Sequence, residues 1–278
     1  MSLLHHERAP AKVNLLLHVG PTRADGLHEL CSLFASVDIA DELVFTRAEG
    51  VDRVHCPGVE GPNLVATALA AFRRETAAQL PPLSVSISKQ IPVAAGLGGG
   101  SADAAAALRA ANDLSGRPLD AAGLRALGAG IGADVPSHIE PRHALVGGAG
   151  ERVEPVALPA MALLIVPRGP GLRAGEVYEE ADRLASPRAV LEPERVRQLA
   201  GAPLEVLAAG LENDLEPAAL SLRPQLERPL GALRAAGALA ALVTGSGPTL
   251  FGVFADRAAA VAAAARVPGS AVSMVRPS

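Results

Sequence analysis

The segment at positions 92–102, PVAAGLGGGSA, combines the features of a phosphate-binding loop. It follows Leu83–Lys89, where strict alternation predicts a strand, and precedes Asp103–Leu114, an alanine-rich stretch typical of a helix. Glycines let a backbone approach a ligand closely, and the free N–H groups at a helix start attract anions. Ser101 lies at the junction, where its hydroxyl can bind phosphate or Mg2+. The segment therefore predicts a cradle for nucleotide phosphates.

The spacing of the glycines separates this loop from two common nucleotide motifs. It is not a P-loop, because no Gly-Lys-Ser/Thr follows. It is not a dinucleotide fingerprint either, because no strand with a terminal acid follows at the expected distance. The structural alternative is an interdomain turn with Ser101 as a plain helix cap, which the density of glycines disfavours. We interpret Asp103 as a first-turn acid favoured by the helix dipole rather than as a catalytic group.

Lysine is scarce in this chain, and its two positions are therefore informative. Lys12 and Lys89 are the only lysines among 25 lysine and arginine residues. A lysine ammonium is a compact point charge that can approach a phosphate closely. The pKa of a lysine also shifts more readily than that of an arginine. The scarcity indicates two sites where arginine cannot replace lysine. The alternative is that codon bias favours arginine and that these two lysines remain by chance.

The bulk composition excludes several classes of protein. The chain has 278 residues, 49% hydrophobic and 19% charged, which is a globular composition with room for two domains. A net charge of -4 without a basic block gives no indication of a nucleic-acid partner. The first residues form no secretory signal, and Ala235–Val243 is too short to span a bilayer, so we expect a soluble, cytoplasmic protein without a membrane partner. Cys31 and Cys56 are expected to be unpaired thiols, although one disulfide is an alternative.

The elements that must position these residues alternate irregularly between strands and helices, which indicates an α+β protein. Asn63 is expected to cap the helix that follows it. A glycine turn at Thr244–Thr249 follows the short strand Ala240–Val243. The other expected strands are Lys12–Val19, Leu33–Ile39, Glu42–Ala48, His143–Gly150, Ala162–Val166 and Leu250–Phe254. The other expected helices are Asn63–Arg74, Leu119–Gly128, Glu176–Ala185, Ala218–Ala236 (interrupted by two prolines) and Arg257–Arg266.

Three segments together resemble the motifs of the GHMP kinases. They are APAKVNL (Ala9–Leu15), GLGGGSADAA (Gly96–Ala105) and TGSGPT (Thr244–Thr249). Two more, RADGLHEL (Arg23–Leu30) and GADVP (Gly132–Pro136), are similar to segments of one family in that group, the 4-diphosphocytidyl-2-C-methyl-D-erythritol kinases. The motifs occur in the family's order and cover nearly the whole chain.

The resemblance implies a two-domain α+β fold of mixed sheets with helices, with the active site in the cleft between the domains. The N-terminal, ATP-binding domain would cover residues 1–157 and the C-terminal domain residues 158–278. The implied reaction moves the γ-phosphate of ATP to the 2-hydroxyl of the cytidylyl substrate, giving the 2-phosphate and ADP. It requires Mg2+ and belongs to the non-mevalonate route to isoprenoid precursors. Alternatives are a homoserine or mevalonate kinase-like enzyme, or a nucleotide-binding regulator without chemistry.

The resemblance also implies the roles of single residues around the transferred phosphate. Asp134 would be the general base and Lys12 its cationic partner, although Asp134 alone could be a turn residue. Lys89 would lie near ATP, and Asn63 and Leu64 beside adenine, with a purely capping role as the alternative for Asn63. The loop residues expected to bind ATP are Pro92, Val93, Ala94, Ala95, Gly96, Leu97, Gly98, Gly99, Gly100, Ser101 and Ala102, with Ser101 also the expected Mg2+ ligand.

At the acceptor end the chain departs from the family pattern. Leu27 stands where the family usually has a tyrosine that stacks on cytosine, so part of the stacking energy should be missing. His28 would read the cytosine edge. Tyr178, the only tyrosine, is proposed as the surviving stacking residue, with a core or surface role as the alternative. Asn14 could bind the erythritol part. Gly245, Ser246 and Gly247 would face the substrate phosphates. From the sequence we expect the protein to be a monomer or a weak homodimer.

Overall fold

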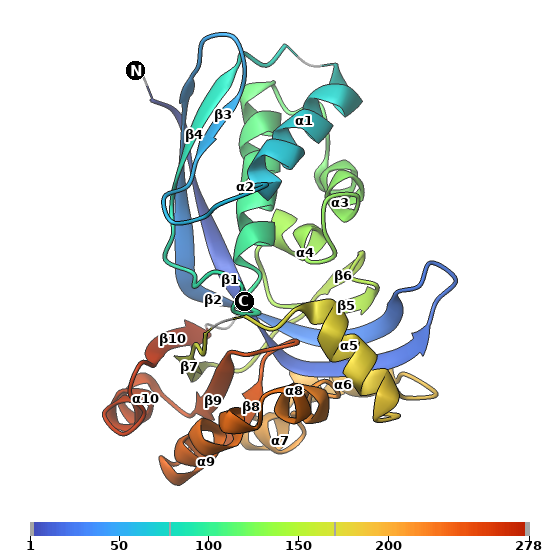
Figure 1. Ribbon diagram of the computed structural model, residues 1–278, viewed down its shortest axis with the longest axis vertical. Coiled ribbons are helices and arrows are strands. Elements are labelled where there is room, and N and C mark those ends of the chain that lie inside the picture. The colour runs from blue at the N-terminus through green and yellow to red at the C-terminus, as the bar shows by residue number, and fades with distance from the viewer. Residues whose placement is uncertain (1–2, 78, 170, 276–278) are drawn as a thin grey trace.

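Two long antiparallel strands, β1 (Leu3–Thr22) and β2 (His28–Arg47), run through both halves of the molecule in the computed structural model (Figure 1). The structure describes residues 3–77, 79–169 and 171–275. Most of β1 beyond Ala9 is buried, because helices, the phosphate-binding loop and the second sheet cover it from different sides. The two strands therefore form the scaffold from which the candidate site is built.

The first sheet has the order β3-β4-β2-β5-β6, with β1 paired to β2. β3 and β4 pair in parallel, whereas the other strand pairs described for this sheet are antiparallel, so the sheet is mixed. Its remaining strands are β3 (Arg53–His55), β4 (Leu83–Ser88), β5 (Ala144–Gly148) and β6 (Arg152–Pro155). The helices beside it in Figure 1 are α1 (Leu64–Thr76), α2 (Gly99–Leu114), α3 (Ala121–Ala129) and α4 (Val135–Ile139). Buried alanines along α2 allow α1 and the strands to pack closely around it.

The second sheet has the order β10-β7-β9-β8 and is antiparallel throughout. Its strands are β7 (Met161–Val166), β8 (Ala240–Val243), β9 (Leu250–Phe254) and β10 (Ala271–Val275). The helices in this half of the chain are α5 (Ala174–Arg183), α6 (Pro193–Ala200), α7 (Leu204–Ala209), α8 (Glu216–Leu222), α9 (Glu227–Ala235), α10 (Arg257–Ala264) and the 3-10 turn η1 (Pro224–Leu226). Of these, α6 packs against β2 and β5 of the first sheet. The predicted α+β class is confirmed.

The two sheets meet in a shared apolar core. One buried cluster includes residues from both sheets and from the loop: Leu15 of β1, Leu33 of β2, Leu97 of the loop, Ile165 of β7 and Phe251 of β9. The chain passes from the first sheet to the second between the end of β6 and the start of β7. We propose this passage as the boundary between domains 1–157 and 158–278.

Two local predictions are confirmed, the Asn63 cap and the unpaired thiols. Asn63 caps α1 by accepting the amide of Val65 at 2.9 Å, and two arginines close the last turn of that helix. Within the described residues Cys31 and Cys56 are free thiols. No helix in the described part of the chain has the length and apolar character needed to cross a membrane.

The strands at the N-terminus were predicted too short. Lys12–Val19 is the middle of β1, while Leu33–Ile39 and all of Glu42–Ala48 except its last residue belong to the single strand β2. Irregularities in the β1–β2 register fall between Pro10 and Lys12 and between Asn14 and Leu16. Such bulges break the alternation of side chains, so periodicity alone does not reveal continuous pairing.

Helix boundaries also differ from the predictions. α2 begins at Gly99, so the last glycines belong to the helix and Ser101 is not its cap. Ala218–Ala236 is divided into α8, η1 and α9, because a proline has no N–H to continue the hydrogen-bond ladder. The sequence reasoning missed the short elements β3, β6, α4, α6, α7 and β10, whose patterns are too brief to stand out.

Candidate active site

Two cavities meet at the phosphate-binding loop. The larger, of ≈ 590 Å³, lies among β1, β2, the start of α4, α5 and the turn after β8. The smaller, of ≈ 310 Å³, lies between the loop, the start of α1 and Lys89. Gly96, Gly98 and Ser101 line both cavities. A ligand in one cavity would therefore face a ligand in the other across the glycines.

Steric limits explain why glycine occupies two positions in the loop. Gly96 and Gly98 have φ angles of 76° and 72°, a region that side chains rarely tolerate. A Cβ on Gly96 would lie 3.0 Å from the carbonyl oxygen of Gly247, and one on Gly98 would lie 2.7 Å from His138 Nε2. The loop thus packs closely against both the turn after β8 and the His138 side chain in the last turn of α4.

Lys12 and Asp134 face each other beside this loop. Lys12 Nζ lies 3.3 Å from Asp134 Oδ2 and donates to Asn14 Oδ1 at 2.6 Å. The ammonium also lies 4.8 Å from the centre of the Phe34 ring. The amide of Lys12 donates to the carbonyl oxygen of Leu97 at 3.0 Å, which ties β1 to the loop. The lysine side chain is buried, whereas the Asp134 carboxylate is a third exposed at 33% and opens into the larger cavity.

A polar network behind Asn14 holds the turn after β8. The amide of Asn14 donates to Thr244 Oγ1 at 2.9 Å, and its side chain donates to Ser32 Oγ at 3.0 Å. Asn213 donates through Nδ2 to the carbonyl oxygens of Val243 and Gly245, at 2.8 and 2.9 Å. The sequence reasoning missed Ser32, Thr244 and Asn213. Two of these residues could have been noticed in the sequence. Thr244 is the first residue of the TGSGPT motif, and Asn213 lies in a polar Glu-Asn-Asp run.

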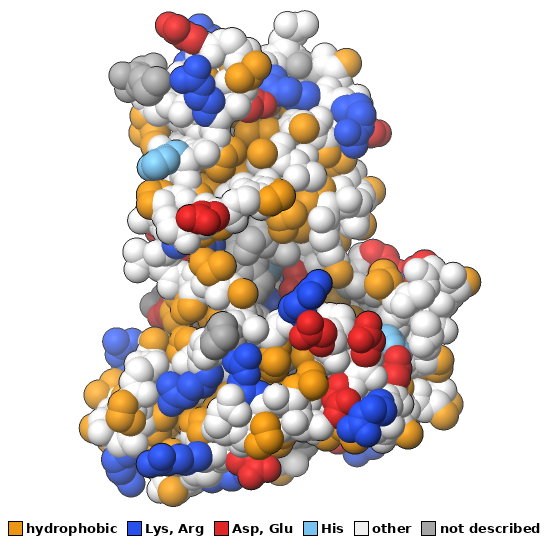
Figure 2. Space-filling view, in the orientation of Figure 1, with side chains coloured by type: hydrophobic (Ala, Val, Ile, Leu, Met, Phe, Trp, Pro, Cys, Tyr) orange, Lys and Arg blue, Asp and Glu red, His pale blue; other side chains and the backbone are white. Residues whose placement is uncertain are grey.

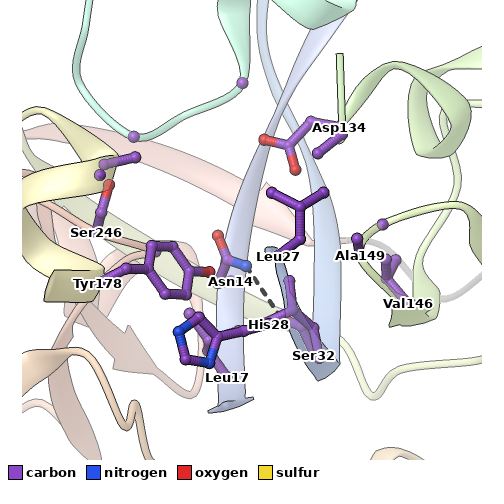
Figure 3. Close-up of a pocket in the computed structure, with 18 of the residues that line it drawn as sticks. Asn14, Leu17, Leu27, His28, Ser32, Asp134, Val146, Ala149, Tyr178 and Ser246 are labelled. Atoms are coloured by element: carbon purple, nitrogen blue, oxygen red, sulfur yellow. Dashed lines mark hydrogen bonds between the residues drawn. The ribbon is translucent and has the colours of Figure 1, made fainter. Parts of the chain in front are cut away.

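The far end of the larger cavity holds an aromatic pair (Figure 3). The Tyr178 ring stacks on the imidazole of His28, with centroids 5.3 Å apart and planes inclined by 20°. His28 Nδ1 donates to the carbonyl oxygen of Gly20 at 3.0 Å, and Nε2 lies 3.3 Å from Asp182 Oδ2. Burial, and then the charge of Asp134, raises the pKa of the Tyr178 phenol. Leu27 is 53% exposed at the rim of this cavity.

Almost all the predicted site residues lie around the two cavities. Asn63, Leu64, Lys89 and the loop from Pro92 to Ser101 line the smaller one. Ala102 does not, because its side chain is buried in the core and its amide donates to the Gly98 carbonyl oxygen. Gly245 and Ser246 line the larger cavity, and Gly247 lies behind them against Val243. The larger cavity also takes in Asn14, Leu27, His28 and Tyr178.

Asp103 is not the first-turn acid that we predicted, because α2 begins four residues earlier, at Gly99. It is 3% exposed, and its Oδ2 accepts from Lys89 Nζ at 2.8 Å. Burial raises the pKa of Asp103 to about 7 against the opposing effect of Lys89. Burial lowers the pKa of Lys89, but Asp103 and Asp41 raise it more. Asp41, which the sequence reasoning did not single out, is fully buried and accepts from the same ammonium.

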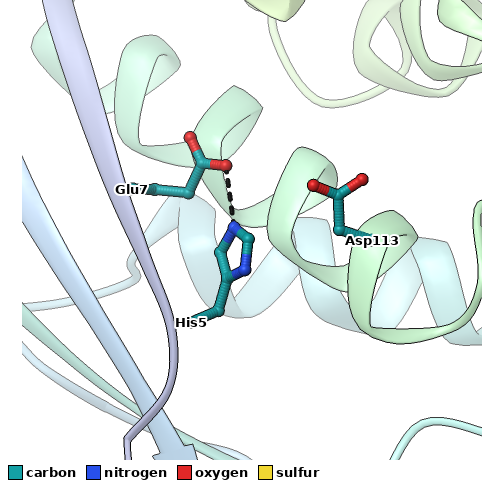
Figure 4. Close-up of side chains that lie close together, drawn as sticks. All are labelled: His5, Glu7 and Asp113. Carbon is teal, nitrogen blue, oxygen red and sulfur yellow. Dashed lines mark hydrogen bonds and ion pairs between the residues drawn. The ribbon is translucent and has the colours of Figure 1, made fainter.

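A separate cluster of His5, Glu7 and Asp113 has the composition of a metal site (Figure 4). Arg109 donates to Glu7 Oε2 through two nitrogens, and Arg117 donates to Asp113 Oδ1 at 2.8 Å. Both carboxylates therefore already have cationic partners. The Arg109–Glu7 pair ties α2 to β1 without an ion.

The comparisons with known proteins agree with this geometry. The N-terminal domain profile of the GHMP kinases matches residues 63–141, and the C-terminal profile matches residues 188–272. A 4-diphosphocytidyl-2-C-methyl-D-erythritol kinase of Anaeromyxobacter dehalogenans is 43% identical over 274 residues, covering 95% of this chain and 85% of the relative. This chain belongs to that family of GHMP kinases. It is therefore an ATP-dependent small-molecule kinase.

Further relatives support the family assignment. The enzyme of the same name from Streptomyces coelicolor is 41% identical over 253 residues, covering 87% of this chain and 85% of the relative. A solved 4-(cytidine 5'-diphospho)-2C-methyl-D-erythritol kinase superposes with a TM-score of 0.78 at 34% identity, covering 97% of this chain and 98% of its own. A homoserine kinase from Cytophaga hutchinsonii, at 19% identity and a TM-score of 0.73 over 100% of this chain and 96% of its own, shares the fold. The predicted GHMP kinase fold is thus confirmed.

His138, in α4, is a buried imidazole in direct reach of this site. It is 3% exposed, and its Nε2 has no hydrogen-bond partner within residues 3–77, 79–169 and 171–275. Burial lowers its pKa from 6.5 to about 4, and the charges of Lys12 and Arg109 add to that effect while Asp134 opposes it. The ring is therefore neutral at pH 7.

We predict that His138 contributes to acid denaturation. Because its pKa is about 4 when folded and 6.5 otherwise, the unfolded chain binds the extra proton in that interval. Above pH 6.5 the ring is neutral in both states and its titration costs the folded protein nothing. As the pH falls from 6.5 toward 4, the free energy of unfolding decreases by about 3 kcal/mol in total. Urea denaturation of His138→Leu at pH 7 and pH 4.5 should show a shallower loss of stability than the parent chain.

The exposed His55 on β3 supplies the control for this measurement. His55→Leu should lose stability with acid as steeply as the parent chain. An equally steep loss in His138→Leu would show that other groups cause the acid sensitivity.

Proposed function

We propose that this kinase transfers the γ-phosphate of ATP to the 2-hydroxyl of 4-diphosphocytidyl-2-C-methyl-D-erythritol, giving the 2-phosphate and ADP. The observation that carries the proposal is the Lys12–Asp134 pair, 3.3 Å apart in the larger cavity, which shares Gly96, Gly98 and Ser101 with the smaller one. The names of the relatives support the identity of the acceptor. The reaction would serve isoprenoid precursor biosynthesis in the cytoplasm, with the enzyme a monomer or weak homodimer.

Asp134 and Lys12 are the proposed catalytic residues. Phosphoryl transfer depends mainly on positioning and charge stabilisation, but the acceptor hydroxyl must still lose a proton. Asp134 opens into the larger cavity and would accept that proton as the general base. Lys12 would keep the carboxylate oriented and stabilise charge on the transferred group. Asn14 holds the ammonium by a 2.6 Å hydrogen bond and would also contact the acceptor.

The smaller cavity is the proposed nucleotide site. Asn63 and Leu64 would lie beside adenine, and the loop from Pro92 to Ser101 would surround the phosphates. The amides at the start of α2 are available there because Gly98 has no side chain to cap the helix. Ser101 lines both cavities and fits a Mg2+ ion held mostly by phosphate oxygens. The ion would supply charge neutralisation.

The larger cavity is the proposed acceptor site. A volume of ≈ 590 Å³ suits a cytidylyl compound better than homoserine or mevalonate, which would leave most of it empty. Tyr178 and His28 would bind the cytosine end, with Leu27 adding apolar contact from the rim. The turn that contains Gly245, Ser246 and Gly247 would face the substrate phosphates.

The acceptor can be tested directly with the purified enzyme. ADP release should depend on 4-diphosphocytidyl-2-C-methyl-D-erythritol and should stay at background with homoserine or mevalonate. Phosphorus NMR of the product should show a new monophosphate on the tertiary 2-carbon. Faster turnover of homoserine or mevalonate would overturn the proposed substrate.

We predict that Asp134→Asn and Lys12→Met each reduce kcat by at least about a hundredfold, the lower range for losing general-base catalysis. Nucleotide binding, measured by calorimetry with a non-hydrolysable ATP analogue, should persist. Asp120→Asn is the matched control, because Asp120 begins α3 as Asp134 begins α4, and asparagine preserves the cap. Near-normal turnover of either site variant would refute the assignment.

We predict that Tyr178→Ala raises the KM for the cytidylyl acceptor roughly tenfold, because a base loses an aromatic stacking partner. The KM for ATP should be unchanged, since Tyr178 lines only the acceptor cavity. Tyr178→Phe keeps the ring and should behave like the parent enzyme. An unchanged acceptor KM in Tyr178→Ala would exclude Tyr178 as the stacking residue.

A further inference from the structure

A buried ionic network lies beneath the phosphate-binding loop. Lys89 Nζ donates to Asp41 Oδ2 and, at 2.8 Å, to Asp103 Oδ2. Asp41 Oδ1 also accepts the backbone amides of Gln90 and Ile91, at 2.6 and 2.8 Å. Asp41 is 0% exposed and Asp103 3% exposed, so both carboxyl groups are removed from water.

The network joins the two ends of the loop to the scaffold strand. Asp41 belongs to β2, Lys89 follows β4 just before the loop, and Asp103 lies in the second turn of α2 just after it. A Cβ on Gly99 would lie 3.3 Å from Lys89 Nζ, so the ammonium sits directly under the start of the helix. The same ammonium thus contacts the segments that enter and leave the cradle.

The charge balance argues against Lys89 as a phosphate ligand. One ammonium faces two carboxyl groups, so the network has no net positive charge whether or not Asp103 carries a proton. A triphosphate that captured the ammonium would leave Asp41 buried without its cationic partner. Breaking a buried ion pair in this way is strongly unfavourable.

We propose that Asp41, Lys89 and Asp103 act as a clamp that sets the position of the phosphate-binding loop. Lys89 is then a positioning residue that acts on the nucleotide through the loop amides, and it does not bind phosphate with its ammonium. The role in nucleotide binding rests on the proposed kinase function. The mechanical part, the tie between β2 and both ends of the loop, does not.

The two roles of Lys89 predict opposite effects of removing Asp103. If the ammonium bound phosphate directly, Asp103 would compete with ATP for it, and Asp103→Ala would lower the KM for ATP. If the network is a clamp, Asp103→Ala loosens the start of α2 and raises that KM. Asp103→Asn keeps an oxygen that can accept from Lys89, so in a clamp it should restore much of the loss.

Steady-state kinetics of these two variants test the proposal. We expect the KM for ATP to rise at least about tenfold in Asp103→Ala, the equivalent of one charge-assisted hydrogen bond, and less in Asp103→Asn. The KM for the acceptor should change little. Asp113→Asn is the control, because Asp113 is an exposed acid near the end of the same helix, paired with Arg117. A lower or unchanged KM for ATP in Asp103→Ala would overturn the clamp.

Hydrogen exchange of the nucleotide-free protein gives a reading that needs no activity. The amide of Ala102, which donates to the Gly98 carbonyl oxygen in the first turn of α2, should exchange at least about tenfold faster in Asp103→Ala than in the parent chain. Exchange of the β2 amides should be unchanged, which separates loss of the clamp from general unfolding. Unchanged exchange of the Ala102 amide would contradict the tie. Failure of the parent enzyme to phosphorylate any acceptor would refute the proposed function, while this exchange would still test the clamp.

Discussion

The close approach of the glycine loop to its surroundings is the constraint on which the rest of the site depends. Gly96 lies against the Gly247 carbonyl and Gly98 against His138, and neither position has room for a Cβ. The amide of Lys12 reaches the Leu97 carbonyl at 3.0 Å from β1. Because three separate parts of the chain contact the loop, its shape is set from outside as much as by its own residues.

The long strands β1 and β2 deliver most of the chemistry to that loop. Lys12 and Asn14 come from β1, and His28 and Ser32 from β2, and all four line the larger cavity. Asp41, also from β2, binds Lys89, which lines the smaller one. Short helices and turns complete the site: α4 brings Asp134, α5 brings Tyr178, and the turn after β8 brings Ser246. A rigid scaffold with catalytic groups on loops and helix starts is a common way to combine precision with access.

Buried charges are concentrated around the phosphate cradle and are nearly balanced. Lys12 meets Asp134 on the acceptor side, and Lys89 meets Asp41 and Asp103 beneath the nucleotide side. His138 remains neutral between them because burial depresses its pKa. Positive potential for ATP must then come largely from backbone amides and the start of α2, rather than from free lysine side chains.

The sequence by itself determined the nature of this protein and much of its local structure. Neighbouring residues determine caps and periodicity, so the sequence was enough to predict the Asn63 cap and the strand before the loop. It was also enough to recognise the glycine loop and the five motifs. Motif order also indicated Lys12 and Asp134. Only the tertiary structure decided that β1 and β2 are continuous and that α2 starts at Gly99.

The partners of buried charges were likewise decided by the tertiary structure. It pairs Lys89 with Asp41, which lies 48 positions away in the sequence. It also shows that Asp103, predicted as a first-turn acid, is a buried partner of the same lysine. It also placed Asn213 beneath a turn more than 30 positions later along the chain. The physical reason is that burial and ion pairing depend on which distant segments pack together, and no local pattern in the chain records that.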